Sequence, residues 1–156
     1  MELKSKKIIS VLAVLCMVLS LTACGKEQTV SYQMESTESG FEMKDTMTLQ
    51  AKGDKVQRMT EVIEINLADL DEESQSLAVS VYESEIVEAY KAVEGVSCSG
   101  ELAEGVYTIT IDFELKGDTV EQLAEQGLLE IEGSTKGISL KRTGDLLEAT
   151  GYTVVE

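Results

Sequence analysis

Histidine, proline and tryptophan are absent from this 156-residue sequence, and cysteine occurs only three times. Histidine is the commonest general base in enzymes and a preferred transition-metal ligand, so its absence removes the usual centre of both chemistries. The two phenylalanines and five tyrosines also provide few rings on which a sugar could stack. These absences argue against most hydrolases and metalloenzymes, and we expect a protein that is not an enzyme and holds no cofactor.

The three cysteines do not form a disulfide framework. Cys16 lies in an apolar run, Cys24 directly follows that run, and Cys98 stands alone in VSCSGE. A nucleophilic thiol needs a neighbouring cation to lower its pKa, whereas the neighbours of Cys98 are serines and a glutamate. We therefore interpret Cys98 as a small buried residue of a strand.

Cations are scarce relative to acids. The chain has 29 aspartates and glutamates against 13 lysines and arginines, a net charge of −16. Without residues 1–23 the balance is 28 acids and 10 bases, or −18. Duplex nucleic acid is excluded as a partner, because phosphates bind clustered lysines and arginines. Anionic lipid head groups should repel such a protein as well, so any membrane anchor has to come from attached lipid.

The N-terminus has the pattern of a bacterial lipoprotein signal. Lysines 4, 6 and 7 precede an apolar run over 8–21, which is shorter than the roughly 20 residues that a membrane-spanning helix needs. The run ends in LTAC, a lipobox, so we expect cleavage between Ala23 and Cys24 and a diacylglycerol, with palmitate-type chains, on the sulfur of Cys24. The alternative is an ordinary secretory signal in which Cys24 is coincidental.

This interpretation sets the domain organisation and the location. Residues 1–23 are the signal peptide, residues 24–30 are the lipidated cysteine and a polar tether, and residues 31–156 form a single domain. The expected location is the extracytoplasmic face of the cell membrane. The partners would be the membrane, through the lipid on Cys24, and an envelope protein or small ligand that the sequence does not identify.

Alternation of apolar and polar residues predicts most of the strands. Segments 30–34, 41–49 and 56–67 read as an antiparallel meander, with ESTESG as a turn and AKGDK as a reversal. Alternation over 41–49 is broken only by Asp45. Residues 96–115 read as a hairpin whose second arm places Ile109 and Ile111 on its apolar face.

Helical periodicity appears in two regions of the sequence, one after the meander and one after the hairpin. A helix should run from the acidic segment 69–73 to about Val93, and Gly95 should end it. Asp118 and Glu121 form a capping box for a short helix, and a last helix should start at Ser139 and stop at Gly151. Residues 129–139 read as a brief strand or loop, and 152–156 as a terminal strand. The fold class is α+β: an antiparallel sheet of meander plus hairpin, with two to three helices packed mainly on one face.

The chain resembles the YehR-like lipoproteins, a family of small bacterial envelope proteins with a domain of unknown function. The lipobox, KGDKVQRMTEVIEI, GVYTITIDFEL and KGISLKRTGDLLEATGY carry the resemblance, which spans nearly the whole chain after residue 23. These are strand, turn and helix signatures. The resemblance therefore implies a fold and an envelope location, and it brings no catalytic residues.

Candidate binding chemistry is limited to clusters of charge. The densest group of oxygen ligands is DLDEES, with Asp69, Asp71, Glu72 and Glu73, but it lacks the glycine and the distal glutamate of a calcium loop, and an acidic helix start explains it. The only local basic cluster is Lys136, Lys141 and Arg142. We expect a binding or accessory module of the cell envelope. A hydrolase using carboxylates or Cys98 and an acidic cation-binding surface protein are the alternatives.

Overall fold

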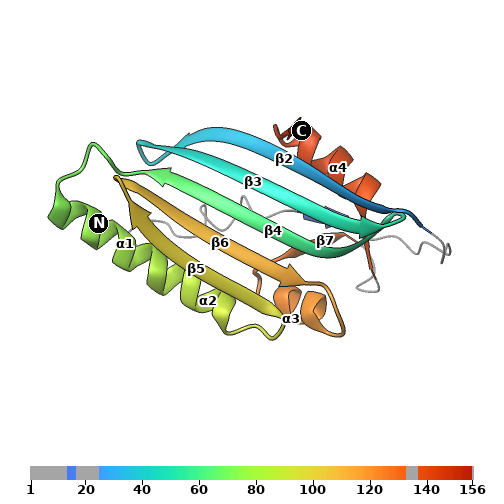
Figure 1. Cartoon of the computed structure of the whole chain (residues 1–156). Helices are drawn as coiled ribbons and strands as arrows, with labels where there is room; N and C mark the ends of the chain where they lie inside the picture. The colour runs from blue at the N-terminus through green and yellow to red at the C-terminus, as the bar shows by residue number, and fades with distance from the viewer. Residues whose placement is uncertain (1–13, 17–24, 133–136, 156) are drawn as a thin grey trace.

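The computed structural model describes residues 14–16, 25–132 and 137–155, with backbone only for 14–16 and 130–132 (Figure 1). The strands are β1 Val14–Cys16, β2 Glu27–Glu38, β3 Phe41–Lys52, β4 Lys55–Asn66, β5 Val96–Ala103, β6 Val106–Glu114, β7 Glu130–Glu132, β8 Ile138–Ser139 and β9 Thr153–Val155. The helices are α1 Glu72–Tyr82, η3 Glu83–Val87, α2 Glu88–Lys91, α3 Thr119–Glu125 and α4 Leu140–Ala149.

One twisted sheet organises the domain. Its strand order is β5-β6-β4-β3-β2-β9, every neighbouring pair is antiparallel, and β8 adds to the start of β4. The β2–β3 turn at Ser39–Gly40 and the β5–β6 turn at Glu104–Gly105 have positive φ at both residues, as two-residue hairpin turns that match the strand twist require. The predicted meander and hairpin are both confirmed.

The first strand is longer than the sequence pattern indicated. β2 begins at Glu27 and continues to Glu38, through the residues predicted as tether (27–30) and most of those predicted as a turn (35–40). Every residue of β2 has a register partner on β3, from Glu27 opposite Lys52 to Glu38 opposite Phe41. The ladder of backbone hydrogen bonds therefore stabilises polar residues that carry no alternation signal, and residues 27–30 of the predicted tether are part of the sheet.

The helices pack on one face of the sheet, which we call the inner face. η3 and its neighbours α1 and α2 cover β5 and β6: the Tyr82 ring stacks on Tyr107 at 5.9 Å between centroids, and Tyr90 meets Phe113 edge-on at 5.7 Å. On the other side of the inner face α4 lies against β2, where Gly144 meets the Tyr32 hydroxyl. The α+β arrangement predicted from the sequence is confirmed.

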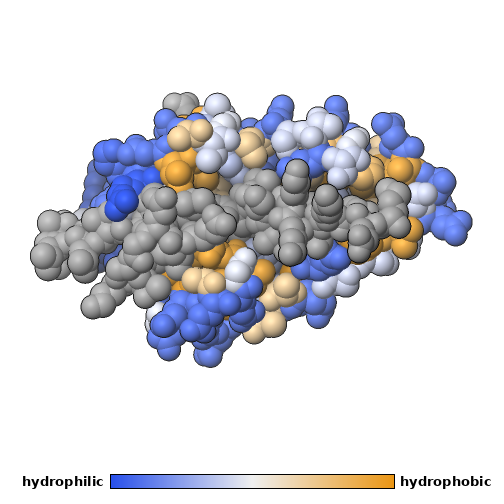
Figure 2. Space-filling view, turned by 180° about the vertical axis from the view of Figure 1, so that it is seen from behind, coloured by the Kyte–Doolittle hydropathy of each residue, from blue (hydrophilic) through white to orange (hydrophobic). Residues whose placement is uncertain are grey.

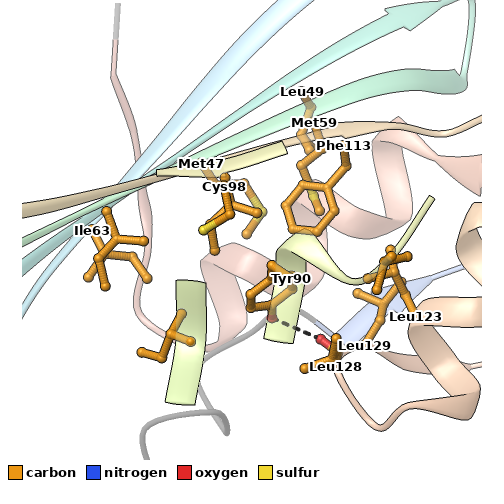
Figure 3. Packing of buried hydrophobic residues seen from close by; sticks show 14 of the residues in the cluster. Met47, Leu49, Met59, Ile63, Tyr90, Cys98, Phe113, Leu123, Leu128 and Leu129 are labelled. Atoms are coloured by element: carbon orange, nitrogen blue, oxygen red, sulfur yellow. Dashed lines mark hydrogen bonds between the residues drawn. The ribbon is translucent and has the colours of Figure 1, made fainter. Parts of the chain in front are cut away.

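The core lies between this face and the helices. Ile109 and Ile111 are fully buried, as predicted, and so are Phe113 and Met47 (Figure 3). The outer face is lined by threonines, serines and charged residues that remain partly exposed. Within the described ranges, the chain forms no helix with the length and apolar character needed to cross a bilayer.

Two local predictions for the helix starts have different outcomes. Ser139 caps α4 as predicted, because its Oγ accepts a hydrogen bond from the Arg142 amide at 3.2 Å. Asp118 precedes α3 but makes no side-chain cap, so the predicted capping box is wrong. Thr119 fixes this helix start instead, donating its hydroxyl to the Glu94 carbonyl at 3.2 Å and the Lys116 carbonyl at 2.9 Å.

Candidate functional site

The predicted lipidation residue, Cys24, and Ala23 before it lie outside the described residues. The chain directly after them is placed at the β3–β4 turn, where the Gly53 amide donates to the Lys26 carbonyl at 3.0 Å. A side chain at Gly25 would collide with the backbone of Gly53, so the two glycines pass each other closely. The point at which a Cys24 anchor would leave the domain is therefore fixed by the fold.

Three of the four acidic candidates for a cation site cap or begin helix α1. The Asp71 carboxylate accepts a hydrogen bond from the Ser74 amide at 2.8 Å, and this bond lowers the pKa of Asp71. Glu72 and Glu73 lie in the first helical turn, where acids complement the helix dipole. Over the described ranges, no three acidic or sulfur side chains gather as a metal site would require.

Cys98 lies on β5 and points into the core. It is only 6% exposed, and Figure 3 shows it in the buried cluster with Tyr90 and Phe113. Burial raises the pKa of the thiol to about 11, an effect that Lys91 reduces in part. The thiol therefore stays protonated at neutral pH, and the interpretation of Cys98 as a buried strand residue is confirmed.

Two buried carboxyl groups on the inner face are the least expected feature of the domain. Asp45 on β3 is 6% exposed and Glu61 on β4 is fully buried. The Tyr152 hydroxyl, just after α4, donates to Asp45 Oδ2 at 2.6 Å. Asp45 Oδ1 and both oxygens of Glu61 have no other donor, so as two carboxylates the pair would be left unsatisfied.

A proton resolves this conflict. Burial raises the pKa of Glu61 well above its ordinary value, and the neighbouring charge of Asp45 raises it further. Protonated Glu61 can donate to Asp45, which gives the carboxylate of Asp45 a second donor beside Tyr152 and leaves one negative charge on the pair. Burial also raises the pKa of Asp45, while hydrogen bonds from Tyr152 and Glu61 oppose that rise.

The pair also acts on its surroundings. Its charges add to burial in raising the pKa of Tyr152 and of Tyr90, both of which therefore remain neutral hydroxyl donors. Glu61 also adds to the rise in the pKa of Cys98. A single shared charge thus lies in a setting of neutral groups.

One member of this pair, Asp45, is recognisable in the sequence. Asp45 was visible as the one break in an alternating apolar strand, and Glu61 occupies the equivalent place between Met59 and Ile63. A charged residue at a position that the pattern assigns to the core is the signal that could have found both. What the pattern does not give is the register, which brings residues from two strands and the chain end together.

Two surface hollows of the described residues lie away from the acid pair. One of about 610 Å³ is lined by Glu35, Lys44 and Glu64 and by their neighbours at the far ends of β2–β4. A second of about 310 Å³ lies between β2 and α4, with Tyr32, Asp54 and Lys141 in its lining. Neither is lined by Asp45, Glu61 or Cys98, so these two hollows do not bring the buried acids to solvent.

The strand β1 lies beside β7 and in contact with α4, and we call the position that it occupies the slot. β1 fills it, pairing in parallel with β7 so that Leu15 is opposite Ile131, and it also contacts α4 and β8. Of the described strands, only β1 pairs with β7. Figure 2 shows hydrophobic residues at the surface of this back face.

The residues directly before β7 are held by hydrogen bonds from elements other than β1. The Tyr90 hydroxyl donates to the Leu128 carbonyl at 3.2 Å (Figure 3). The amides of Leu128 and Leu129 both donate to the Leu123 carbonyl, at 2.9 and 3.2 Å. Leu128 and Leu129 are buried, so packing and these hydrogen bonds hold the residues directly before β7.

Comparison with known proteins places the fold. A family model described as a protein of unknown function (DUF1307) matches residues 28–153. The NMR structure of Escherichia coli YehR is similar at 19% identity and a TM-score of 0.59, covering 84% of this chain and 92% of that one. The NMR structure of a protein from Streptococcus pneumoniae TIGR4 is similar at 12% identity and a TM-score of 0.54, covering 89% and 91%. No curated protein matched.

Proposed function

Because the chain belongs to the DUF1307 family, a YehR-like domain of unknown function, we propose that it acts as a lipid-anchored binding module on the extracytoplasmic face of the cell membrane. The lipobox at residues 21–24 supports the anchor. The observation that carries the binding role is the slot between β7 and α4, which accepts an extended apolar segment. The ligand we propose is an apolar polypeptide segment bound by strand addition.

Processing would open this slot. Cleavage before Cys24 removes residues 14–16, and β7 then loses the one strand partner that it has in the described structure. An unpaired strand edge leaves backbone donors and acceptors free, and these favour an incoming strand over a lipid chain, which has no amides to pair with them.

The enzyme alternative has weaker support. The Cys98 thiol is buried and protonated, so it is a poor nucleophile. Asp45 and Glu61 have the perturbed pKa values of an acid–base pair, but they lie within the packed core. The cation-binding alternative rests on Asp69 and its neighbours, of which Asp71 is committed to the helix cap.

Peptide titration of the processed domain tests the proposal. The probe is a synthetic peptide of residues 10–20 with Cys16→Ser and added terminal lysines, titrated into isotopically labelled residues 25–156. We expect saturable shifts concentrated in β7, β8 and α4. A matched peptide with alternate backbone amides N-methylated keeps its apolar side chains but cannot pair as a strand. It should bind at least about tenfold more weakly, since strand addition derives its affinity from main-chain hydrogen bonds.

Two variants of the domain sharpen this test. Tyr90→Phe removes the hydroxyl that holds the Leu128 carbonyl and should weaken peptide binding. Tyr82→Phe, a change of the same size on the same helical segment that keeps the ring against Tyr107, should leave binding unchanged. Equal binding of the two peptides, or no binding of either, would refute strand addition.

A further inference from the structure

Basic side chains gather at one corner of this acidic domain. The corner, which we call the anchor corner, consists of residues 25–27, the β3–β4 turn at 52–55 and the start of α4 at 139–142. In Figure 1 these three segments lie together at the right-hand end of the sheet. They carry five exposed cationic side chains: Lys26, Lys52, Lys55, Lys141 and Arg142.

Hydrogen bonds and strand pairing hold the three segments together. Lys52 is opposite Glu27 on β2 and opposite Lys55 across the turn, and Lys55 is in turn opposite Ser139. Asp54 ties the turn to α4. Its Oδ1 accepts from the Lys141 amide at 2.8 Å, its Oδ2 accepts from the Ser139 hydroxyl at 2.6 Å, and its carbonyl accepts from the Leu140 amide at 2.7 Å.

The charge of this corner is opposite to that of the remaining molecule. Half of the ten cations that follow residue 23 lie here, against four acids at or beside the corner: Glu27, Asp54, Asp145 and Glu148. Asp145 pairs with the Lys141 ammonium group at 2.5 Å. Both carboxylate oxygens of Asp54 accept hydrogen bonds from the start of α4. The corner together with Asp145 and Glu148 beside it therefore has a net charge of +1, whereas the other residues after 23 sum to −19.

The anchor would leave the domain at this same corner. Gly25 lies against Gly53, and Cys24 is one peptide unit away, about 3.8 Å between Cα atoms. A lipid on Cys24 thus holds the corner within a few ångströms of the head groups, well inside the Debye length of about 8 Å at physiological salt. Over that range the cations act on anionic lipid, and the acidic remainder is pushed away from the membrane.

We propose that the anchor corner docks on anionic phospholipid and fixes the orientation of the domain on the membrane, with the far ends of β2–β4 turned toward solvent. The inference rests on the proposed anchor at Cys24 and not on the β7 slot. It differs from the expectation drawn from net charge alone, that anionic head groups repel this protein, because it takes account of where the charges lie.

The test uses the processed domain coupled through Cys24 to a maleimide lipid in nanodiscs, with Cys98→Ala so that coupling occurs at one thiol. Paramagnetic relaxation from gadolinium-chelating lipids reports how closely each amide approaches the membrane. With phosphatidylglycerol present we expect the largest effects at residues 26, 52–55 and 141–142. With phosphatidylcholine alone, or at high salt, the effects should spread over the domain.

Paired variants separate local charge from total charge. Lys52→Gln with Lys55→Gln should lower the ratio of docked to undocked orientations by about tenfold or more, since each cation near an anionic surface contributes severalfold. Lys44→Gln with Lys91→Gln changes the net charge equally, away from the corner, and should leave the pattern intact. Identical patterns in the two lipids, or equal losses in both variants, would overturn the proposal. Chemical coupling makes this result independent of whether the cell acylates Cys24.

Discussion

At the scale of single residues, the domain is unusual in placing Asp45 and Glu61 where an apolar sheet face would carry methionine or isoleucine. Glu61 lies between Met59 and Ile63 on β4, opposite Met47 on β3 and Ile111 on β6, and all four of these neighbours are buried. Transferring a carboxylate into such a setting is costly unless it is neutralised or fully hydrogen-bonded. We infer that a proton shared by the two carboxyl groups reduces this cost.

This arrangement predicts how stability depends on pH. The folded-state pKa of Glu61 lies above its unfolded value near 4.5, so the folded state binds a proton that the unfolded chain releases. Stability from this group is complete below about pH 4.5 and falls as the pH rises toward the folded pKa. Glu61→Gln keeps a donor for Asp45 without the titration, and should raise the free energy of unfolding by about 1–3 kcal/mol at pH 8.

Chemical denaturation of wild type and Glu61→Gln between pH 5 and pH 8 tests this prediction. The increase in the free energy of unfolding caused by Glu61→Gln should become smaller toward pH 5. The other titratable groups near Glu61 are Asp45, Tyr152, Tyr90 and Cys98, and all four remain in both proteins. Glu64→Gln is the control on the same strand, since Glu64 lies on the outer face beside Lys44. A Glu61→Gln domain that is less stable than wild type at pH 8 would show that the proton is not shared.

At the scale of elements, α4 illustrates what a sequence reveals and what it conceals. Its start at Ser139 and its stop at Gly151 follow from capping chemistry, and both are confirmed. Gly144 in its middle is unexplained by any helix rule, because glycine disfavours helix interiors. The structure supplies the reason: a methyl group at this position would meet the Tyr32 hydroxyl on β2, so glycine permits α4 to pack closely.

Gly144→Ala should therefore destabilise the domain. The gain in helix propensity is about 1 kcal/mol, whereas overpacking a tight contact usually costs about 1–3 kcal/mol. The Tyr32→Phe background removes the colliding oxygen, and there the same substitution should be neutral or stabilising. Denaturation of the two single variants and the double variant closes this cycle. If Gly144→Ala is equally harmful with phenylalanine at position 32, the hydroxyl contact is not the cause.

The strands also differ in how well the sequence predicts them. Clean alternation identified β3, β4 and β6, because each buries one face and exposes the other. β2 was predicted too short at both ends, since its outer residues are polar and its length is set by pairing with β3. The acid pair, the slot beside β7 and the anchor corner each combine segments distant in sequence, so no local pattern could predict them.

At the scale of the whole molecule, one antiparallel sheet separates three regions in space. The outer face is polar, the inner face holds the core and the slot between β7 and α4, and the corner beside Gly25 collects the cations. The fold class and the family were predictable because alternation and helical periodicity act locally. The charge segregation was not, because net charge counts residues without placing them.

The attachment at Cys24 is the premise on which the proposed location and the role of the corner depend. The most direct measurement is the intact mass of the protein from the membrane fraction of its own host, beside that of Cys24→Ala. We predict a chain that begins at residue 24 and carries the added mass of a diacylglycerol, whereas Cys24→Ala should remain uncleaved or leave the membrane. A membrane-bound chain with an unmodified Cys24 would contradict the account.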